Sequence, residues 1–121
     1  MTTYEGSCHC GKVVFEIDTE FDKAATCNCS ICRRRNAVMH RVPAERFRLI
    51  RGNDDLVLYQ FNTDTAKHYF CGTCGIYPFH MPRLAPEDYT VNVFCLAGVD
   101  DDDIARLAIN QFDGQSFSLA D

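Results

Sequence analysis

The sequence has no long apolar run and no tryptophan, and these two absences limit what the protein can be. No stretch approaches the roughly 18 consecutive apolar residues of a membrane-spanning helix, so no membrane segment is expected. The first residues, Met1 to Glu5, hold neither a basic region nor an apolar run, so nothing there is typical of a secretory leader. We therefore expect a cytoplasmic protein whose aromatic side chains are phenylalanine and tyrosine alone.

Repeats, linkers and low-complexity segments are also absent, which argues for one domain. A chain of 121 residues is long enough for a single domain and too short for two of ordinary size. Hydrophobic residues make up 46% and charged residues 24%, which is ordinary for a globular protein and excludes a disordered one. We expect residues 1–121 to form a single domain with one core.

An excess of basic charge is missing too, which disfavours nucleic acid as a partner. The net charge is −5, and residues 100–121 account for it with six acidic side chains and one basic one. The acidic run Asp100–Asp103 can cap and favourably charge the start of a short helix, with calcium binding as the alternative. The basic cluster Arg33–Arg35 is short and directly follows a cysteine motif, which favours a local anion site over a duplex-binding face.

Cysteine, by contrast, is abundant: the chain has eight, and seven of them lie in three compact motifs. The motifs are Ser7-Cys8-His9-Cys10-Gly11, Cys27-Asn28-Cys29-Ser30-Ile31-Cys32 and Cys71-Gly72-Thr73-Cys74-Gly75. Thiolates at C-x-C and C-x-x-C spacing can converge on one tetrahedral metal ion, and four sulfurs at about 2.3 Å form a closed structural zinc site. Seven ligands suggest one closed four-cysteine site and a second site with three protein ligands and an open position for water or a substrate thiol.

Disulfide bonds are the alternative explanation for these cysteines. A reducing cytoplasm disfavours them, and two cysteines one residue apart, such as Cys8 and Cys10, are poorly placed to bridge each other. The eighth cysteine, Cys95, lies outside the motifs. It is either a small buried core residue or a fourth ligand that would close the three-cysteine site.

The apolar patterning predicts a mainly β fold with two short helices. Strands are expected at residues 13–17, 37–42, 47–50, 56–61, 67–70, 76–79 and 89–96. One helix should open from the second cysteine motif and run through Arg35, and another should start near residues 100–103. The third cysteine motif directly follows Phe70, so it should form a knuckle at a hairpin tip that meets the knuckle near residue 9.

The three motifs, in this order, resemble those of the glutathione-dependent formaldehyde-activating enzyme and centromere protein V family, from about Gly6 to Gly114. The resemblance implies a mainly β, single-domain zinc-knuckled β-tent with short helices, similar to methionine sulfoxide reductase B. It also implies two zinc ions. The structural ion would be held by Cys8, Cys10, Cys71 and Cys74. The catalytic and more labile ion would be held by Cys27, Cys29 and Cys32.

The activity implied by the resemblance is that of a carbon–sulfur lyase. It is the reversible addition of the glutathione thiol, or of a related thiol, to formaldehyde or another small aldehyde, with S-hydroxymethylglutathione as the glutathione product. The expected partner is therefore a small thiol such as glutathione, bound by a monomer or homodimer that takes neither nucleic acid nor membrane.

Basic side chains and histidines complete the set of candidate site residues. The carboxylates of a glutathione-like thiol need charge-assisted contacts, for which the candidates are Arg33, Arg34, Arg35 and Arg83. A fourth metal ligand or proton shuttle could be any of the histidines, which are His9, His40, His68 and His80. His80 is the strongest of these for the substrate site, because Phe79-His80-Met81-Pro82-Arg83 follows the third cysteine motif.

Two other classes of protein remain as alternatives. A non-catalytic binding or scaffold module would use both zinc ions to replace the core that a small β domain lacks. A thiol redox enzyme is the weaker alternative, because no cysteine stands in a nucleophile setting apart from metal-ligand spacing.

Overall fold

The computed structural model describes residues 1–117. The first of its two sheets has three strands, with the largely buried strand β2 (Val14–Thr19) in the middle. Strand β1 (Thr2–Ser7) pairs antiparallel with β2, which pairs with β5 (Phe47–Arg51). In β2 the side chains of Phe15 and Ile17 are fully buried, as the alternation of a half-buried strand requires. Gly6 lies under the Phe15 ring, where an added Cβ would meet a ring carbon at 2.2 Å. This close approach explains why a glycine occupies that position of β1.

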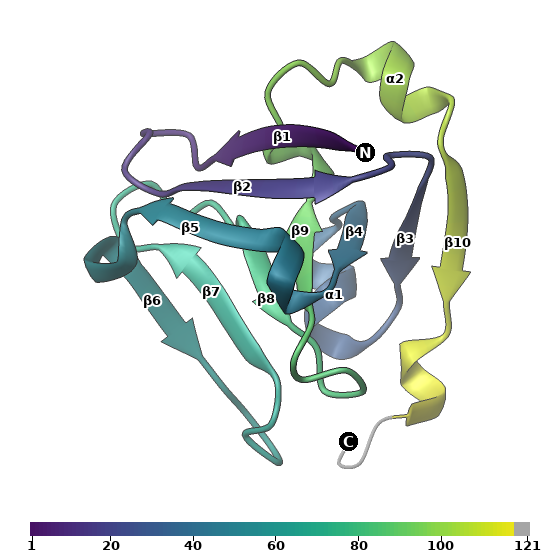
Figure 1. The fold of residues 1–121 in the computed structure, drawn as a ribbon. Helices are drawn as coiled ribbons and strands as arrows, with labels where there is room; N and C mark the ends of the chain where they lie inside the picture. The colour runs from purple at the N-terminus through teal and green to yellow at the C-terminus, as the bar shows by residue number, and fades with distance from the viewer. Residues whose placement is uncertain (118–121) are drawn as a thin grey trace.

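The second sheet has seven strands and carries most of the chain (Figure 1). In order across the sheet they are β10 (Ala108–Phe112), β3 (Lys23–Cys27), β4 (Met39–Val42), β9 (Tyr89–Asn92), β8 (Phe79–Met81), β7 (Lys67–Cys71) and β6 (Leu56–Tyr59). The pairing of β10 with β3 is parallel, and the other pairs are antiparallel. The parallel pair brings the C-terminal segment beside the second cysteine motif.

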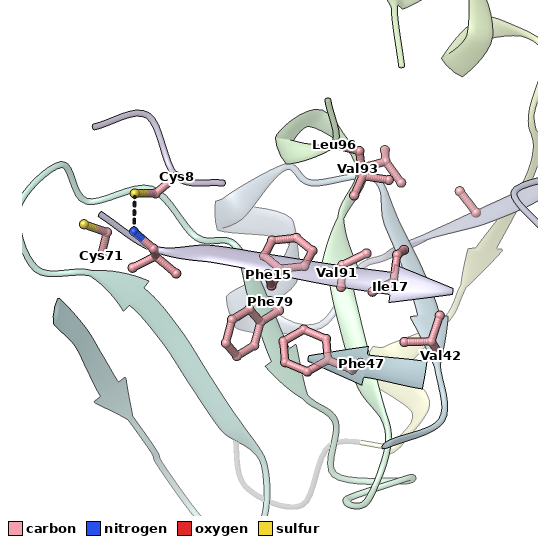
Figure 2. Packing of buried hydrophobic residues seen from close by; sticks show 12 residues of the cluster. Cys8, Phe15, Ile17, Val42, Phe47, Cys71, Phe79, Val91, Val93 and Leu96 are labelled. Atoms are coloured by element: carbon pink, nitrogen blue, oxygen red, sulfur yellow. Dashed lines mark hydrogen bonds between the residues drawn. The ribbon is translucent and has the colours of Figure 1, made fainter. Parts of the chain in front are cut away.

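The core lies between the two sheets and is aromatic at its centre (Figure 2). Phe15 from β2 packs against Phe47 from β5 at a centroid distance of 5.6 Å and against Phe79 from β8 at 5.8 Å. Tyr89 stacks on Phe47 at 3.9 Å, which extends the cluster to β9. Phenylalanine and tyrosine thus supply the large buried surface that tryptophan would supply in other cores.

Two short α-helices are present in residues 1–117, and both match the sequence-based prediction. Helix α1 (Ser30–Arg35) opens from the second cysteine motif and ends at Asn36, which adopts the left-handed conformation with φ of 52°. Helix α2 (Asp101–Ala105) starts with a capping box, in which Asp100 accepts from the Asp103 backbone N–H and Asp103 accepts in return. The acidic run therefore caps a helix. No helix in the described chain is long and apolar enough to cross a membrane.

Five of the predicted strands are confirmed with bounds within two residues: 13–17, 37–42, 47–50, 56–61 and 67–70. The strand predicted at 76–79 was wrong for residues 76–78, since β8 begins only at Phe79. The strand predicted at 89–96 ends at Asn92, because the Asn92 side chain accepts from the Phe94 N–H and starts a 3-10 turn, Val93–Cys95.

Three strands were missed, and each lacks the usual strand signal. The pattern of β1 has only one buried residue, β3 is rich in alanine, and every residue of β10 is exposed. Their pairing is what makes them strands, and for β10 that pairing joins segments about 85 residues apart in the chain, such as Ala108 with Lys23. A local pattern does not carry such information.

Candidate metal centres and the cavity beside them

The first candidate metal centre joins the three-stranded sheet to the seven-stranded sheet. Cys8 follows β1 and Cys71 ends β7, and their knuckles bring in Cys10 and Cys74, so that all four Sγ atoms lie within 4.8 Å of one another. Cys10 Sγ lies 3.6 Å from the Sγ atoms of both Cys8 and Cys71. The Val13 backbone N–H also donates to Cys8 Sγ at 3.4 Å (Figure 2). The predicted meeting of the two knuckles is confirmed.

The geometry of this four-cysteine cluster fits a tetrahedral zinc ion. Sulfurs bound at about 2.3 Å to a tetrahedral ion lie about 3.8 Å apart, close to the spacings seen here. Cys8 and Cys71 are also buried, with 3% and 0% of their surface exposed, and they cap one end of the core (Figure 2). Cys10 is exposed at the surface, but four cysteine ligands fill the coordination of a tetrahedral ion, so the cluster is suited to a site that stabilises the fold.

The second candidate centre is a three-cysteine cluster around the start of α1. Cys27 ends β3, Cys29 is the N-cap of α1 and Cys32 lies in its first turn, and their Sγ atoms lie within 4.8 Å of one another. The Cys29 backbone N–H donates to Cys27 Sγ at 3.5 Å. Hydrogen bonds from the Cys27 and Cys32 side chains lower the pKa of Cys29. No fourth ligand joins this cluster within residues 1–117.

The segment after β10 packs directly onto the three-cysteine cluster. Gly114 is buried, and a Cβ there would lie 2.5 Å from Cys27 Sγ and 2.9 Å from Cys29 Cβ. Asn28 holds this segment: its side chain donates to Asp113 Oδ1 at 2.9 Å and accepts from the Gln115 N–H at 3.0 Å. Neither Asn28 nor Gly114 carries a sequence signal for this role, because the contacts join residues 85 to 87 positions apart.

The three cysteines form part of the wall of a cavity of about 600 Å³. It opens between α1, the β3–β10 pair and the loops that follow β6 and β8. Besides the cysteines, its lining includes His40, His68, His80 and Arg83, together with several aromatic and aliphatic side chains. The four-cysteine cluster is not part of this lining. The two clusters therefore differ in that all three cysteines of the second line this cavity, whereas none of the four in the first does.

Arg35, the last residue of α1, lies under this site. Its Nη2 is 2.6 Å from His68 Nδ1 and 4.0 Å from Cys32 Sγ, and its Nη1 is 3.4 Å from His80 Nδ1. Its guanidinium carbon also stacks 4.0 Å from the centre of the Tyr77 ring. No carboxylate in residues 1–117 forms an ion pair with it. The nearest groups able to balance this charge are the thiolates of the three-cysteine cluster.

The arginine determines which nitrogen of each histidine holds the proton. A guanidinium only donates, so His68 Nδ1 accepts, and the proton of the neutral ring lies on Nε2. His80 Nδ1 is contacted by Arg35, which only donates, so this nitrogen also accepts; the Tyr77 hydroxyl contacts the same nitrogen and donates to the Thr90 carbonyl at 3.3 Å. Burial, assisted by the Arg35 charge, lowers the pKa of His68 to about 4 and that of His80 well below its ordinary value. Both rings are therefore neutral at pH 7, with an Nε2–H to offer to a ligand.

The predicted substrate-binding residues divide into two groups. His80 and Arg83 line the cavity, and Arg83 also donates to the Phe117 carbonyl. Arg33 and Arg34 are exposed on α1 and do not line it, and Arg34 donates to the Ser30 carbonyl at 2.7 Å. Of the basic triplet, only Arg35 turns toward the cysteines.

The other histidines and the eighth cysteine do not join either cluster in residues 1–117. His40 uses both ring nitrogens, at 2.8 Å from the Thr19 hydroxyl and 2.8 Å from the Lys23 carbonyl, and His9 is exposed. Cys95 packs against the main core and its Sγ lies 3.8 Å from the Tyr77 carbonyl. Burial raises the pKa of Cys95 to about 12, which keeps it a thiol. The idea that Cys95 closes the three-cysteine site is wrong, because the fold places it beside the core.

Comparison with known proteins shows that this chain is similar to one family over the range that holds the cysteine motifs. A family profile described as glutathione-dependent formaldehyde-activating enzyme matches residues 3–112, a range that includes both cysteine clusters. A crystal structure of a Rhodobacter sphaeroides protein is similar to this chain, with 46% sequence identity and a TM-score of 0.79. That match covers 87% of this chain and 98% of the other.

Proposed function

The chain belongs to the family of glutathione-dependent formaldehyde-activating enzymes, and we propose that it is a zinc-dependent carbon–sulfur lyase. The reaction is the reversible addition of a thiol, such as glutathione, to formaldehyde or another small aldehyde. One observation carries the proposal: all three sulfur-bearing residues of the three-cysteine cluster line the cavity of about 600 Å³, whereas two of the four cysteines in the other cluster, Cys8 and Cys71, are buried in the core. A purely structural pair of sites would give no reason for that difference.

Two zinc ions fit the two clusters. Cys8, Cys10, Cys71 and Cys74 would hold a structural ion, and Cys27, Cys29 and Cys32 would hold a second ion with one open position. When bound there, zinc would lower the pKa of a substrate thiol, and three thiolate ligands suit it better to this than to activating water. The remaining chemistry is the work of the protein's own side chains.

Arg35 would balance the charge of the three-cysteine centre. Three thiolates and one divalent zinc carry a net charge of −1, and the guanidinium lies 4.0 Å from Cys32 Sγ. At an effective dielectric constant of about 20, a unit charge pair at this distance is worth about 4 kcal/mol. Without this cation, binding one more thiolate would add negative charge to a centre that is already anionic.

His68 and His80 would stabilise the oxygen on which charge develops. As the thiol sulfur bonds to the carbonyl carbon, the carbonyl π pair moves to oxygen, and the proton lost by the thiol ends on that oxygen. The Nε2–H groups of the two neutral rings, whose tautomers Arg35 sets, are the donors available to this oxygen in the cavity. Arg83 at the cavity wall would pair with a carboxylate of the thiol.

A pair of cysteine variants tests the proposal. Cys29→Ser should lose the second zinc and the accelerated exchange between glutathione and S-hydroxymethylglutathione, measured by NMR in the presence of formaldehyde. Cys95→Ser is the matched control and should keep both zinc ions and the activity, because Cys95 contacts no other cysteine thiol.

Two results would overturn the proposal. The first is a wild-type protein that holds two zinc ions but accelerates exchange with none of the thiols and aldehydes tested. In that case the protein would be a zinc-stabilised binding module. The other is loss of zinc from both variants, which would make Cys95 a ligand.

A further inference from the structure

The cavity is much larger than a small aldehyde needs. Formaldehyde has two heavy atoms, whereas a volume of about 600 Å³ lies within the range of roughly 300–1,000 Å³ found for pockets that take drug-sized ligands. The rest of the substrate must therefore fill most of the space. The character of the walls indicates what kind of molecule that is.

One wall is an exposed aromatic pair beside the cysteines. Phe112 and Phe117 stack with centroids 5.3 Å apart and an angle of 11°, and both line the cavity. They remain 37% and 46% exposed. Phe112 is the residue of β10 paired with Cys27 in the parallel register. An apolar group bound next to the thiols would cover these rings, and the gain is roughly 25 cal/mol per Å² of apolar surface removed from water.

A second wall is a row of nearly parallel rings. Phe61, which is 39% exposed, stacks on His68 at 5.6 Å and 22°, and His68 stacks on His80 at 5.3 Å and 25°. The row leads from the open side of the cavity to Arg35 beneath the cysteines. Aromatic side chains thus stand on two walls of the cavity, and edge or offset contacts with their rings favour an aromatic group in the ligand.

Among residues 1–117, the charged side chains that line the cavity are all basic. The chain has 17 acidic residues and 12 lysines and arginines, yet no Asp or Glu from residues 1–117 lines the cavity. Lys23, Arg41 and Arg83 do line it. Arg41 pairs with Asp88 at 3.6 Å, but no ion pair within the described chain involves Lys23 or Arg83. Of these two, Arg83 lies at the Phe117 end of the cavity, beside the aromatic pair, and is the cation suited to a carboxylate of a ligand bound there.

We propose that the thiol substrate of this protein combines an aromatic group with a carboxylate. The inference rests on the proposed function and narrows its substrate class from glutathione-like thiols to aryl-bearing anionic ones. The chemistry is unchanged: one carbon–sulfur bond forms, the carbonyl π bond breaks, the thiol proton moves to oxygen, and nothing is oxidised or reduced.

Three probes separate the two features of the ligand. They are 4-(mercaptomethyl)benzoate, which has both features, benzyl mercaptan, which lacks the charge, and mercaptoacetate, which lacks the ring. Calorimetry on the zinc-loaded full chain should give the first probe an affinity at least about tenfold above each of the others. Similar affinities for the first probe and mercaptoacetate would overturn the inference.

Matched variants locate the contacts. Phe112→Ala should reduce the ratio of the affinity for 4-(mercaptomethyl)benzoate to the affinity for mercaptoacetate to about threefold or less. Phe117→Ala serves the same purpose if Phe112→Ala does not fold. Phe94→Ala is the control, because Phe94 is 57% exposed but outside the cavity. Arg83→Gln should reduce the advantage over benzyl mercaptan, and Arg46→Gln, at an exposed position away from the lining, should not. Equal effects of target and control variants would place the ligand elsewhere.

The failure of this inference can be told from the failure of the proposed function. If the protein accelerates glutathione–formaldehyde exchange but binds the aromatic acid no better than mercaptoacetate, the inference fails and the function stands. If the aromatic acid binds with the expected dependence on Phe112 and Arg83 but no exchange is accelerated, the ligand class stands and the lyase proposal fails.

Discussion

At the scale of single residues, Arg35 is the side chain on which the site depends most. It touches Cys32, both cavity histidines and the Tyr77 ring, and its Nε is buried without a partner in residues 1–117. A buried cation costs free energy unless a nearby anion compensates it, and the three cysteines would supply that anion as the thiolates of the proposed zinc centre. The arginine and the metal centre should therefore depend on each other.

We predict that Arg35→Met weakens zinc binding at the three-cysteine centre at least about tenfold, because it removes a compensating charge worth several kcal/mol. Competition with a chromophoric chelator on the whole chain measures the effect. Arg34→Met is the matched control: Arg34 bonds only the Ser30 carbonyl at the surface, so the variant should bind zinc as the wild type does. Equal zinc affinities of the wild type, Arg35→Met and Arg34→Met would show that Arg35 does not stabilise the metal centre.

At the scale of elements, the segment after β10 acts as a cover for the cysteine turn. It is attached through Asn28, which exchanges hydrogen bonds with Asp113 and Gln115, including one from Gln115 Nε2 to the Asn28 carbonyl at 3.0 Å. Gly114 then fits against Cys27 because it has no Cβ. Strand pairing brings the segment to the site, and Asn28 positions its last turn.

We predict that Asn28→Ala loosens residues 113–117 without unfolding the protein. Two side-chain hydrogen bonds are lost at an exposed position, so the free energy of unfolding should fall by about 1–2 kcal/mol. Hydrogen exchange should rise in residues 113–117 and stay unchanged in β2. Asn53→Ala, at an exposed position outside the cavity lining, is the control. Unchanged exchange in the variant would show that β10 alone holds the segment.

At the scale of the whole molecule, the two metal centres should differ in what they do for the fold. The four-cysteine cluster joins the end of β1 to the end of β7 and caps the core, whereas the three-cysteine cluster holds only one turn and a short helix (Figure 1). An ion held by four ligands also leaves more slowly than one held by three.

We predict that mild chelation removes one of two zinc ions and leaves the circular dichroism spectrum and the thermal transition nearly unchanged. Cys71→Ser, in contrast, should prevent stable folding, because the fully buried Cys71 links β7 to the Cys8 knuckle. Elemental analysis of each sample gives the metal count. A stable, folded Cys71→Ser protein would contradict the structural assignment.

Acid should destabilise the protein through His68. Its pKa falls from an ordinary 6.5 to about 4 in the fold, mainly through burial, so the unfolded chain takes up the proton at higher pH than the folded chain. The stability that neutral His68 contributes is complete above about pH 6.5 and is lost as the pH falls toward 4. Urea midpoints of the zinc-loaded protein should drop across this window, and less steeply in His68→Gln. Protonation of the cysteine thiolates also releases zinc, so zinc release is followed with a dye in both proteins to separate that effect from the titration of His68. Equal slopes of the urea midpoint against pH in the wild type and His68→Gln would contradict the prediction.

Much of the site was readable in the sequence because its information is local. The seven cysteines stand at short spacings that only tight turns around an ion explain, and the motif order was enough to identify the family that the comparisons confirm. The capped helix α2 and five strands followed from short-range patterns in the same way. The basic triplet Arg33–Arg35 was also recognised from the sequence as a set of candidate site residues.

Only the tertiary structure decided which of these residues face the three-cysteine cluster. Successive helix positions point about 100° apart, so Arg33, Arg34 and Arg35 cannot share one surface, and packing against Tyr77 determines that Arg35 is the one turned inward. The closeness of Gly114 to Cys27 and the stacking of Phe61 on His68 depend on strand pairing between distant segments. Spacing along the chain determines which sulfurs can share an ion, because a turn is short, whereas the walls of the cavity come from contacts that exist only once both sheets have formed.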